Sequence, residues 1–177
     1  MPFKVAVVGH SQVPTTYETP PGVEIKVFRR PGALVDHMFQ PPLSNVFAYK
    51  PDLVFLFLGA NDIARHRHEP VYISNKLTDI LARLTEVSTH VRFVNLERRH
   101  YPTSNHFGLS NSDYERCRRF VNQRMRRYCK WAHILTVNIT SLWFYEHLNA
   151  DGVHLDRVAS FELKRKILNV IGHCLEK

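Results

Sequence analysis

Short apolar runs alternate along the chain with longer segments of helical spacing. The apolar runs are residues 3–8, 23–28, 53–58, 91–96 and 134–139. Each run is rich in Val, Ile, Leu or Phe, which is typical of strands buried on both faces. The segments with helical spacing are residues 71–87, 113–131 and 157–175. This alternation predicts a parallel sheet with helices on both of its faces.

Prolines and irregular polar segments divide these elements. The prolines at 41, 42 and 51 bracket a weak helical pattern over residues 43–49. Pro70 is expected at the start of the next helix, where its missing N–H costs nothing. Residues 97–112 have no clear periodicity and are rich in Asn and Ser, so they predict a long loop after the fourth strand. Such a loop would overhang the crevice at the strand ends.

The length of 177 residues is enough for one domain with a sizeable core. We therefore expect a single domain over residues 1–177. Because the strand pattern begins almost at the first residue, the same segment would also fit a domain excised from a longer protein. No apolar run approaches the roughly 20 residues of a membrane span. The first residues lack the separate apolar segment of a signal peptide, so we expect an intracellular, cytoplasmic protein.

The charged residues and cysteines limit the partners. Twenty-four Lys and Arg against 16 Asp and Glu give a formal net charge of +8. This balance favours anionic partners such as nucleic acid, acidic membrane surfaces or negatively charged substrates. The three cysteines cannot all pair and form no C-x-x-C motif, which favours reduced thiols over a disulfide framework or a zinc ribbon.

Several short motifs carry the residue types of a serine hydrolase. Ser11 follows the first apolar run and is expected at the carboxyl end of a strand, where open α/β sheets bind ligands. A serine hydroxyl needs a neighbouring base, and His154 can take its proton. Asp151, three residues earlier, can orient that histidine. Taken alone, the dipeptide Asp151-Gly152 is also typical of a simple turn. Asn61, which follows the third apolar run, favours the hydrolase interpretation because it places an amide at the same crevice.

These motifs resemble the SGNH (GDSL-like) hydrolases, named for Ser, Gly, Asn and His in four separated motifs. The resemblance implies Ser11, Asp151 and His154 as the catalytic triad, and the Ser11 N–H, the Gly32 N–H and the Asn61 amide as the oxyanion hole. It further implies a three-layer α/β/α, flavodoxin-like fold with five parallel strands in the order 2-1-3-4-5. No metal or cofactor is required by this chemistry, and we expect none.

The first motif departs from the family pattern. His10 stands before the serine, where the family usually has Asp. His10 could act as a second base, contact the substrate or hydrogen-bond the backbone as a filler. The motifs Gly-His-Ser, Gly-Ala-Asn-Asp-Ile and Asp-Gly-Val-His-Leu also resemble the esterase domain in the first-reading-frame proteins of some non-LTR retrotransposons.

Other candidate residues have a structural alternative. Trp143, shortly before the Asp-His motif, could wall a substrate pocket or pack in the core. His66 and His68 could suggest a metal, but they have no carboxylate or thiolate partner at ligand spacing. Asp62 is interpreted as structural, holding a loop that contains Asn61.

A basic stripe follows one side of the predicted helix over residues 113–131. Its members are Arg116, Arg119, Arg126, Arg127 and Lys130. Such a stripe can bind RNA phosphates or an acidic surface, but it is also typical of a solvated helix face.

We therefore predict a serine esterase that acts on small, short-acyl (acetyl-type) esters through an acyl-enzyme, with lipid esters as another substrate class. One alternative is a catalytically weak module that binds nucleic acid or assembles with retroelement components. A second alternative is a scaffold that keeps the fold for protein assembly.

Overall fold

The protein is described by a computed structural model over residues 1–66, 68–100, 108–139 and 148–177. The strands are β1 (Phe3–Gly9), β2 (Val23–Arg29), β3 (Leu53–Phe57), β4 (His90–Val94) and β5 (Leu135–Val137). They form one sheet in the order β2-β1-β3-β4-β5, and every neighbouring pair is parallel. The predicted strands, their direction and their order are confirmed.

The helical segments are η1 (Val35–Phe39), α1 (Asn45–Tyr49), α2 (Ala60–His66), α3 (Pro70–Thr85), α4 (Asn111–Trp131) and α5 (Arg157–Leu175). The three long predicted helices and the helical start at Pro70 are confirmed. The N-termini of α4 and α5 are capped by Ser110 and Asp156, whose side chains accept hydrogen bonds from the backbone N–H groups of Asp113 and Ala159. Two segments, η1 and α2, were not expected from the sequence.

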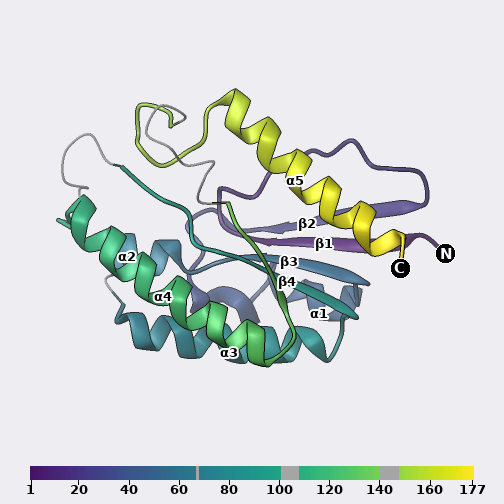
Figure 1. Ribbon diagram of the computed structural model, residues 1–177, viewed down its shortest axis with the longest axis horizontal. Coiled ribbons are helices and arrows are strands. Elements are labelled where there is room, and N and C mark those ends of the chain that lie inside the picture. The colour runs from purple at the N-terminus through teal and green to yellow at the C-terminus, as the bar shows by residue number, and fades with distance from the viewer. Residues whose placement is uncertain (67, 101–107, 140–147) are drawn as a thin grey trace.

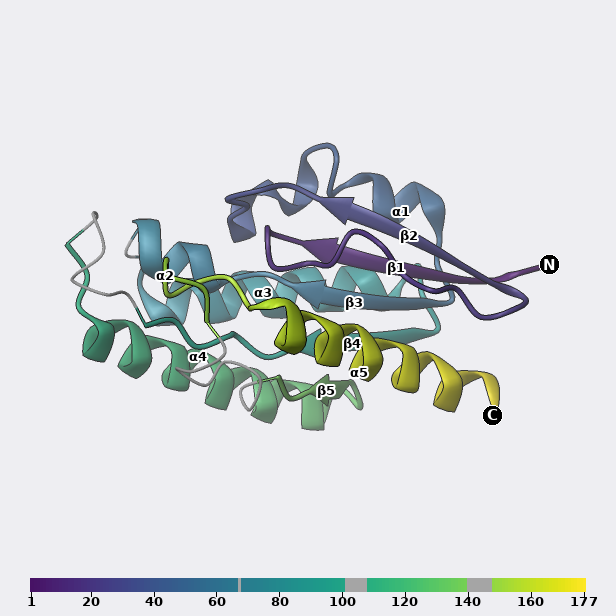
Figure 2. The ribbon, with the colours of Figure 1, turned by 90° about the horizontal axis from the view of Figure 1, so that it is seen from above.

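The helices cover the two faces of the sheet (Figures 1 and 2). Helix α5 lies across one face, and α3 and α4 lie across the other. The alternation of side chains along each strand matches this division. In β1, Ala6 and Val8 join the core beneath α3 and α4, whereas Val5 and Val7 join the core beneath α5.

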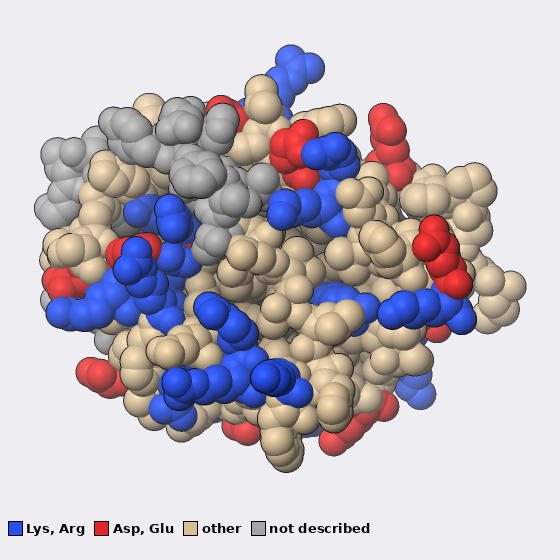
Figure 3. Space-filling view, in the orientation of Figure 1, with Lys and Arg blue, Asp and Glu red and all other residues tan. Residues whose placement is uncertain are grey.

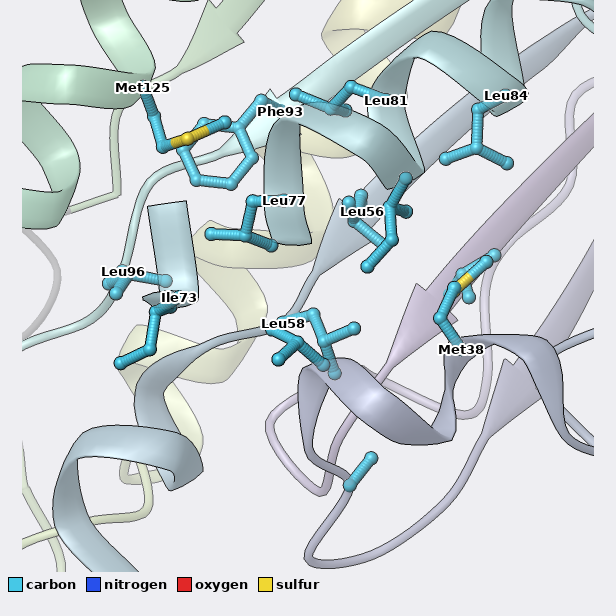
Figure 4. Packing of buried hydrophobic residues seen from close by; sticks show 14 of the residues in the cluster. Met38, Leu56, Leu58, Ile73, Leu77, Leu81, Leu84, Phe93, Leu96 and Met125 are labelled. Carbon is cyan, nitrogen blue, oxygen red and sulfur yellow. The ribbon is translucent and has the colours of Figure 1, made fainter. Parts of the chain in front are cut away.

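Buried aliphatic and aromatic side chains fill the larger core (Figure 4). Leu56 of β3, Leu77 of α3, Phe93 of β4 and Met125 of α4 are at most 1% exposed. Burying each such side chain stabilises the fold by roughly 1.5–3 kcal/mol. This core holds the central strands β1 and β3 in place, and the carboxyl ends of these strands lead into Ser11 and Asn61.

The expectation that all five strands are buried on both faces is wrong for β2 and β5. Glu24 and Lys26 of β2 are exposed, and Leu135 of β5 is 56% exposed. The reason is their position, because β2 and β5 form the two edges of the sheet and fewer elements cover them.

The long loop predicted over residues 97–112 is confirmed for residues 97–100 and 108–110 and is wrong for residues 111–112, which form the start of α4. Residues 97–100 and 108–110 contain no helix or strand. Residues 101–107 lie outside the described part of the chain, so the predicted overhang remains an expectation. None of the described helices is long and apolar enough to cross a membrane.

Candidate active site

The side chains of Ser11, His154 and Asp151 lie within hydrogen-bonding distance of one another in that order, although Ser11 and Asp151 are 140 positions apart in the chain. His154 Nε2 lies 3.3 Å from Ser11 Oγ, and His154 Nδ1 lies 2.6 Å from Asp151 Oδ2. A carboxylate can only accept a hydrogen bond, so the proton of the neutral imidazole belongs on Nδ1. This tautomer leaves the Nε2 lone pair facing the Ser11 hydroxyl, which is the arrangement that a general base requires.

Backbone hydrogen bonds hold the Asp151 carboxylate. Asp151 Oδ1 accepts from the backbone N–H groups of Val153 at 2.9 Å and His154 at 3.0 Å. Partial burial raises the pKa of this carboxyl, but the hydrogen bonds from the His154 side chain and from these two N–H groups outweigh it. The pKa of Asp151 therefore lies below its usual range. The group stays an anion and can stabilise an imidazolium beside it.

Two hydrogen bonds connect the loop of Asp151 and His154 to the rest of the site. Gln12 Nε2, next to Ser11 in sequence, donates to the Val153 carbonyl at 2.9 Å. The backbone N–H of His100, from the loop after β4, donates to the Gly152 carbonyl at 2.8 Å. These contacts connect distant segments of the chain, because Gln12 and His100 supply the donors and two carbonyls of the Asp151/His154 loop accept them.

Two backbone N–H groups named as oxyanion donors by the family resemblance carry no hydrogen bond in the described structure. Within the described residues, neither the Ser11 N–H nor the Gly32 N–H donates to another group. Gly32 has a φ of +72°, and a Cβ there would approach Nη1 of Arg65 to 2.4 Å. The positive φ favours glycine at this position, whereas the nearby Arg65 guanidinium is the end of a flexible side chain that can move. N–H groups without a partner can donate hydrogen bonds to an oxygen on which negative charge develops.

The orientation of the Asn61 amide follows from its neighbours. Asn61 Nδ2 donates to the Ala33 carbonyl at 3.1 Å, and Asn61 Oδ1 accepts from Nη2 of Arg99 at 3.0 Å. Guanidinium groups only donate and carbonyl oxygens only accept, so the opposite orientation would place two donors and two acceptors face to face. Of the two hydrogens on Nδ2, one binds Ala33 and the other remains for a ligand.

A buried polar network lies behind Asn61 and Ser11. Arg99 Nη2 also lies 3.0 Å from Glu97 Oε1, and His10 Nε2 lies 3.5 Å from the same oxygen. The three side chains are only 1–3% exposed. Burial alone raises the pKa of Glu97, but the positive potential of His10 and Arg99 outweighs it and holds this pKa well below its usual range. Glu97 is therefore a buried carboxylate that depends on its partners.

His10 occupies the position where the sequence departs from the family pattern. Its Nδ1 accepts a hydrogen bond from the backbone N–H of Gln12 at 3.2 Å, and its side chain is 1% exposed. This buried position favours the alternative in which His10 hydrogen-bonds the backbone over direct contact with substrate. Glu97 and Arg99, which complete its surroundings, were missed from the sequence. The signal was a Glu-x-Arg pair immediately after an apolar strand.

Asn61 and Asp62 lie in the first turn of helix α2, not in a loop as expected. The sequence prediction missed α2 because it has only seven residues, too few to show a clear helical period. The structural role predicted for Asp62 agrees with its contacts. Its carboxylate accepts from the backbone N–H of Val35 and lies 3.0 Å from Nδ1 of His68.

The remaining candidates lie on another surface or outside the described residues. The stripe of Arg116, Arg119, Arg126, Arg127 and Lys130 is exposed on α4, as predicted. Trp143 lies outside the described residues, as does the side chain of His66. Within the described part of the chain, no group of three or more His, Cys, Asp or Glu side chains could hold a metal ion.

Comparison with known proteins identifies the family. Residues 12–158 match the GDSL-like lipase/acylhydrolase family, a range that starts immediately after Ser11 and includes Gly32, Asn61, Asp151 and His154. The chain belongs to this family. No curated protein matches the GDSL-like chain, so solved structures provide the other comparison.

Three solved structures are similar to this GDSL-like chain over nearly its whole length. A putative acylhydrolase from Bacteroides fragilis has a TM-score of 0.75 at 15% identity, covering 98% of this chain and 88% of its own. The acetylxylan esterase Axe2 from Geobacillus stearothermophilus has a TM-score of 0.70 at 17% identity, covering 96% and 94%. The psychrotrophic esterase EstA from Pseudoalteromonas sp. has a TM-score of 0.68 at 12% identity, covering 99% and 100%. At these identities the likeness shows the shared fold.

Proposed function

We propose that the protein is a serine esterase that hydrolyses small, short-acyl esters through an acyl-enzyme intermediate. The observation that carries this proposal is a pair of contacts made by the His154 imidazole. Its Nε2 lies 3.3 Å from Ser11 Oγ, and its Nδ1 lies 2.6 Å from Asp151 Oδ2. Membership of the GDSL-like lipase/acylhydrolase family supports the same reaction class.

The first half of the reaction forms the acyl-enzyme. Ser11 Oγ attacks the ester carbonyl carbon, and its proton passes to His154 Nε2. Negative charge develops on the former carbonyl oxygen, where the N–H groups of Ser11 and Gly32 and the second Nδ2 hydrogen of Asn61 would stabilise it. The bond to the alcohol oxygen then breaks, and His154 returns the proton to that oxygen as the alcohol leaves.

The second half releases the acid. A water molecule attacks the acyl carbon while His154 takes its proton, the bond to Ser11 Oγ breaks, and the serine regains its proton from the imidazolium. Asp151 remains an anion throughout and stabilises the imidazolium at both stages. All the groups that this route requires belong to the chain itself.

An acetyl-type acyl group is the proposed substrate preference. The structurally similar Axe2 is an acetylxylan esterase, which supports short acyl groups without deciding the alcohol. Lipid esters are the competing substrate class, and a series of aryl esters of increasing acyl length separates the two.

The decisive test is the reactivity of Ser11. We expect a fluorophosphonate to label the wild-type protein covalently at Ser11 and to leave Ser11→Ala unlabelled. Ser11→Ala should also lower the turnover of an aryl acetate by on the order of 10³-fold or more with the fold intact by circular dichroism. A folded Ser11→Ala protein that keeps about a tenth of wild-type turnover would rule out this nucleophile.

Three finer predictions are kept as proposals. The resemblance to the esterase domains of retrotransposon first-reading-frame proteins is one, since none of the three structures named above is of that class. Binding of RNA or an acidic surface by the α4 stripe is another, and a cytoplasmic location is the third. None of them is needed for the esterase chemistry.

A further inference from the structure

A polar pocket opens beside Ser11 and His154. Its walls are the loop after Ser11, the end of β2 and the first half of α5, and its volume is about 280 Å³. Arg29 and Lys164 contribute the charged groups. Among the described residues that line it, none is acidic. The pocket therefore has two cations and no carboxylate to balance them.

The two cations have little to bind within the protein. Arg29 Nη2 donates to the Ser11 carbonyl at 3.3 Å, whereas its buried Nε has no hydrogen-bond partner in the described structure. Among the described residues, Lys164 Nζ donates to Thr16 Oγ1 alone, at 3.2 Å. Neither cation forms an ion pair with any carboxylate of the described residues. Cations that line one small concave site raise the local concentration of an anion there.

The position of the pocket relates it to one part of an ester. Ser11 and His154 line the pocket, whereas Gly32 and Asn61, two of the three proposed oxyanion donors, do not. During acyl transfer the carbonyl oxygen faces the oxyanion donors, and the alcohol oxygen must reach the histidine that protonates it. The pocket therefore lies on the side of the departing alcohol.

Resting on the proposed esterase function, we propose that this pocket binds an anionic group, a carboxylate or a phosphate, on the alcohol portion of the ester. Arg29 supplies planar N–H donors that suit either anion, and Lys164 supplies a second positive charge from α5. The substrate class is thus a short-acyl ester of a negatively charged alcohol.

The test compares matched acetyl esters. The substrates are 4-acetoxybenzoate, 4-acetoxyphenyl phosphate and the neutral 4-acetoxybenzamide, and the measured quantity is the ratio of kcat/KM for each anionic ester to that for the amide. We expect Arg29→Met and Lys164→Met each to lower this ratio about tenfold. Raising the salt concentration should lower it in the wild-type protein. Lys166→Met, on the same helix but outside the pocket, is the matched control and should keep the wild-type ratio.

The ratio separates anion binding from damage to the nucleophile. Because Arg29 also contacts the Ser11 carbonyl, its loss can slow all three esters together, and only a change in the ratio supports the proposal. Equal kcat/KM ratios in the wild type, Arg29→Met and Lys164→Met would overturn it.

A second readout keeps the pocket testable if the protein hydrolyses none of the esters. In that case the proposed function fails, and binding of 4-acetoxybenzoate to the unreacted Ser11→Ala protein is measured by NMR titration. Loss of that binding in Ser11→Ala with Arg29→Met and Lys164→Met would still support the anion pocket. Binding that persists without the two cations, or that is absent from the Ser11→Ala protein, would overturn it.

Discussion

The orientation of the Asn61 amide is fixed by one hydrogen-bond donor and one acceptor on either side of it. Its Oδ1 accepts from Arg99 and its Nδ2 donates to the Ala33 carbonyl, so the amide cannot rotate without losing both bonds. A donor that is already oriented costs no reorganisation when charge develops in the transition state. We therefore interpret Arg99 as a positioning residue that acts through Asn61.

Substitution of Asn61 and of the pair behind it tests this interpretation. Asn61→Ala should lower kcat by roughly 10²–10³ with a smaller change in KM, as expected for the loss of one oxyanion donor. Arg99→Met alone removes the guanidinium partner of the buried Glu97 carboxylate, leaves only His10 beside it, and should cost up to about 3–5 kcal/mol of stability. Adding Glu97→Gln should recover part of that stability, measured by urea unfolding, while kcat stays low.

A double-mutant cycle separates positioning from general damage. If Arg99 acts through Asn61, the combined substitution Arg99→Met with Glu97→Gln should lower kcat in the wild-type background and add little to Asn61→Ala. If the fold-reductions in kcat from Asn61→Ala and from the Arg99→Met, Glu97→Gln pair multiply in the combined variant, Arg99 and Glu97 influence turnover independently of Asn61. The KM values, measured in the same series, should change less than kcat.

Among the elements, the short helices η1 and α2 are joined by one buried carboxylate. Asp62 in α2 is 0% exposed and accepts from the backbone N–H of Val35 at the start of η1. Burial raises the pKa of Asp62 to about 6, although the hydrogen bonds from His68 and Val35 lower it in part. The segment that carries Gly32 is thereby tied to the helix that carries Asn61.

This raised pKa predicts how stability depends on pH. Because folded Asp62 has a pKa of about 6 against an ordinary 3.8, the folded state holds the proton more tightly than the unfolded state. Its contribution to stability is complete below about pH 4 and is lost as the pH rises through about 6. The wild-type free energy of unfolding should therefore fall by up to about 3 kcal/mol more than that of Asp62→Asn over this interval.

Chemical denaturation at a series of pH values measures this difference. His68 and Asp36 are the titratable groups that influence Asp62, so His68→Phe should extend the fall to higher pH, because His68 lowers the pKa of Asp62. Asp79→Asn, which removes an exposed carboxylate of α3, is the matched control and should retain the wild-type pH dependence. Parallel curves for the wild type and Asp62→Asn would contradict the prediction.

At the scale of the whole molecule, exposed positive charge gathers in two places. One is the pocket beside Ser11, and the other is the surface of α4. Lys and Arg side chains gather along α4 on the face shown in Figure 3. Arg116 and Arg119 pair with Asp113 and Glu115 on the same helix, and exposed pairs of this kind are worth little. A surface of this kind acts on a polyanion through the release of counterions, independently of acyl transfer.

Charge reversal on α4 tests whether this surface binds RNA. If Arg119, Arg126 and Arg127 contact phosphates, their replacement by Glu should flatten the salt dependence of single-stranded RNA binding by roughly 0.7 for each lost contact. Ester turnover should be unchanged in the same preparations. The same charge change at Arg157, Arg165 and Lys177, outside α4, is the control. If the two triple variants bind RNA with the same affinity and salt dependence, the basic stripe of α4 is only a solvated helix face and does not bind RNA.

The local pattern of the sequence determined most of the fold. Strands such as β3 and helices such as α5 follow from runs of neighbouring residues, because hydrophobic periodicity and terminal caps act over a few positions. The residue types of the candidate triad could also be named, since acyl transfer requires a nucleophile, a base and a carboxylate in any fold. Sequence spacing alone could not establish that Ser11 and His154 meet.

Only the tertiary structure decided what surrounds those residues. The network of His10, Glu97 and Arg99 and the cations Arg29 and Lys164 come from segments far apart in the chain, and no local pattern records which of them become neighbours. Burial, charge balance and hydrogen-bond partners depend on how the elements pack, so the chemistry of the pocket became visible only once the sheet and α5 were assembled.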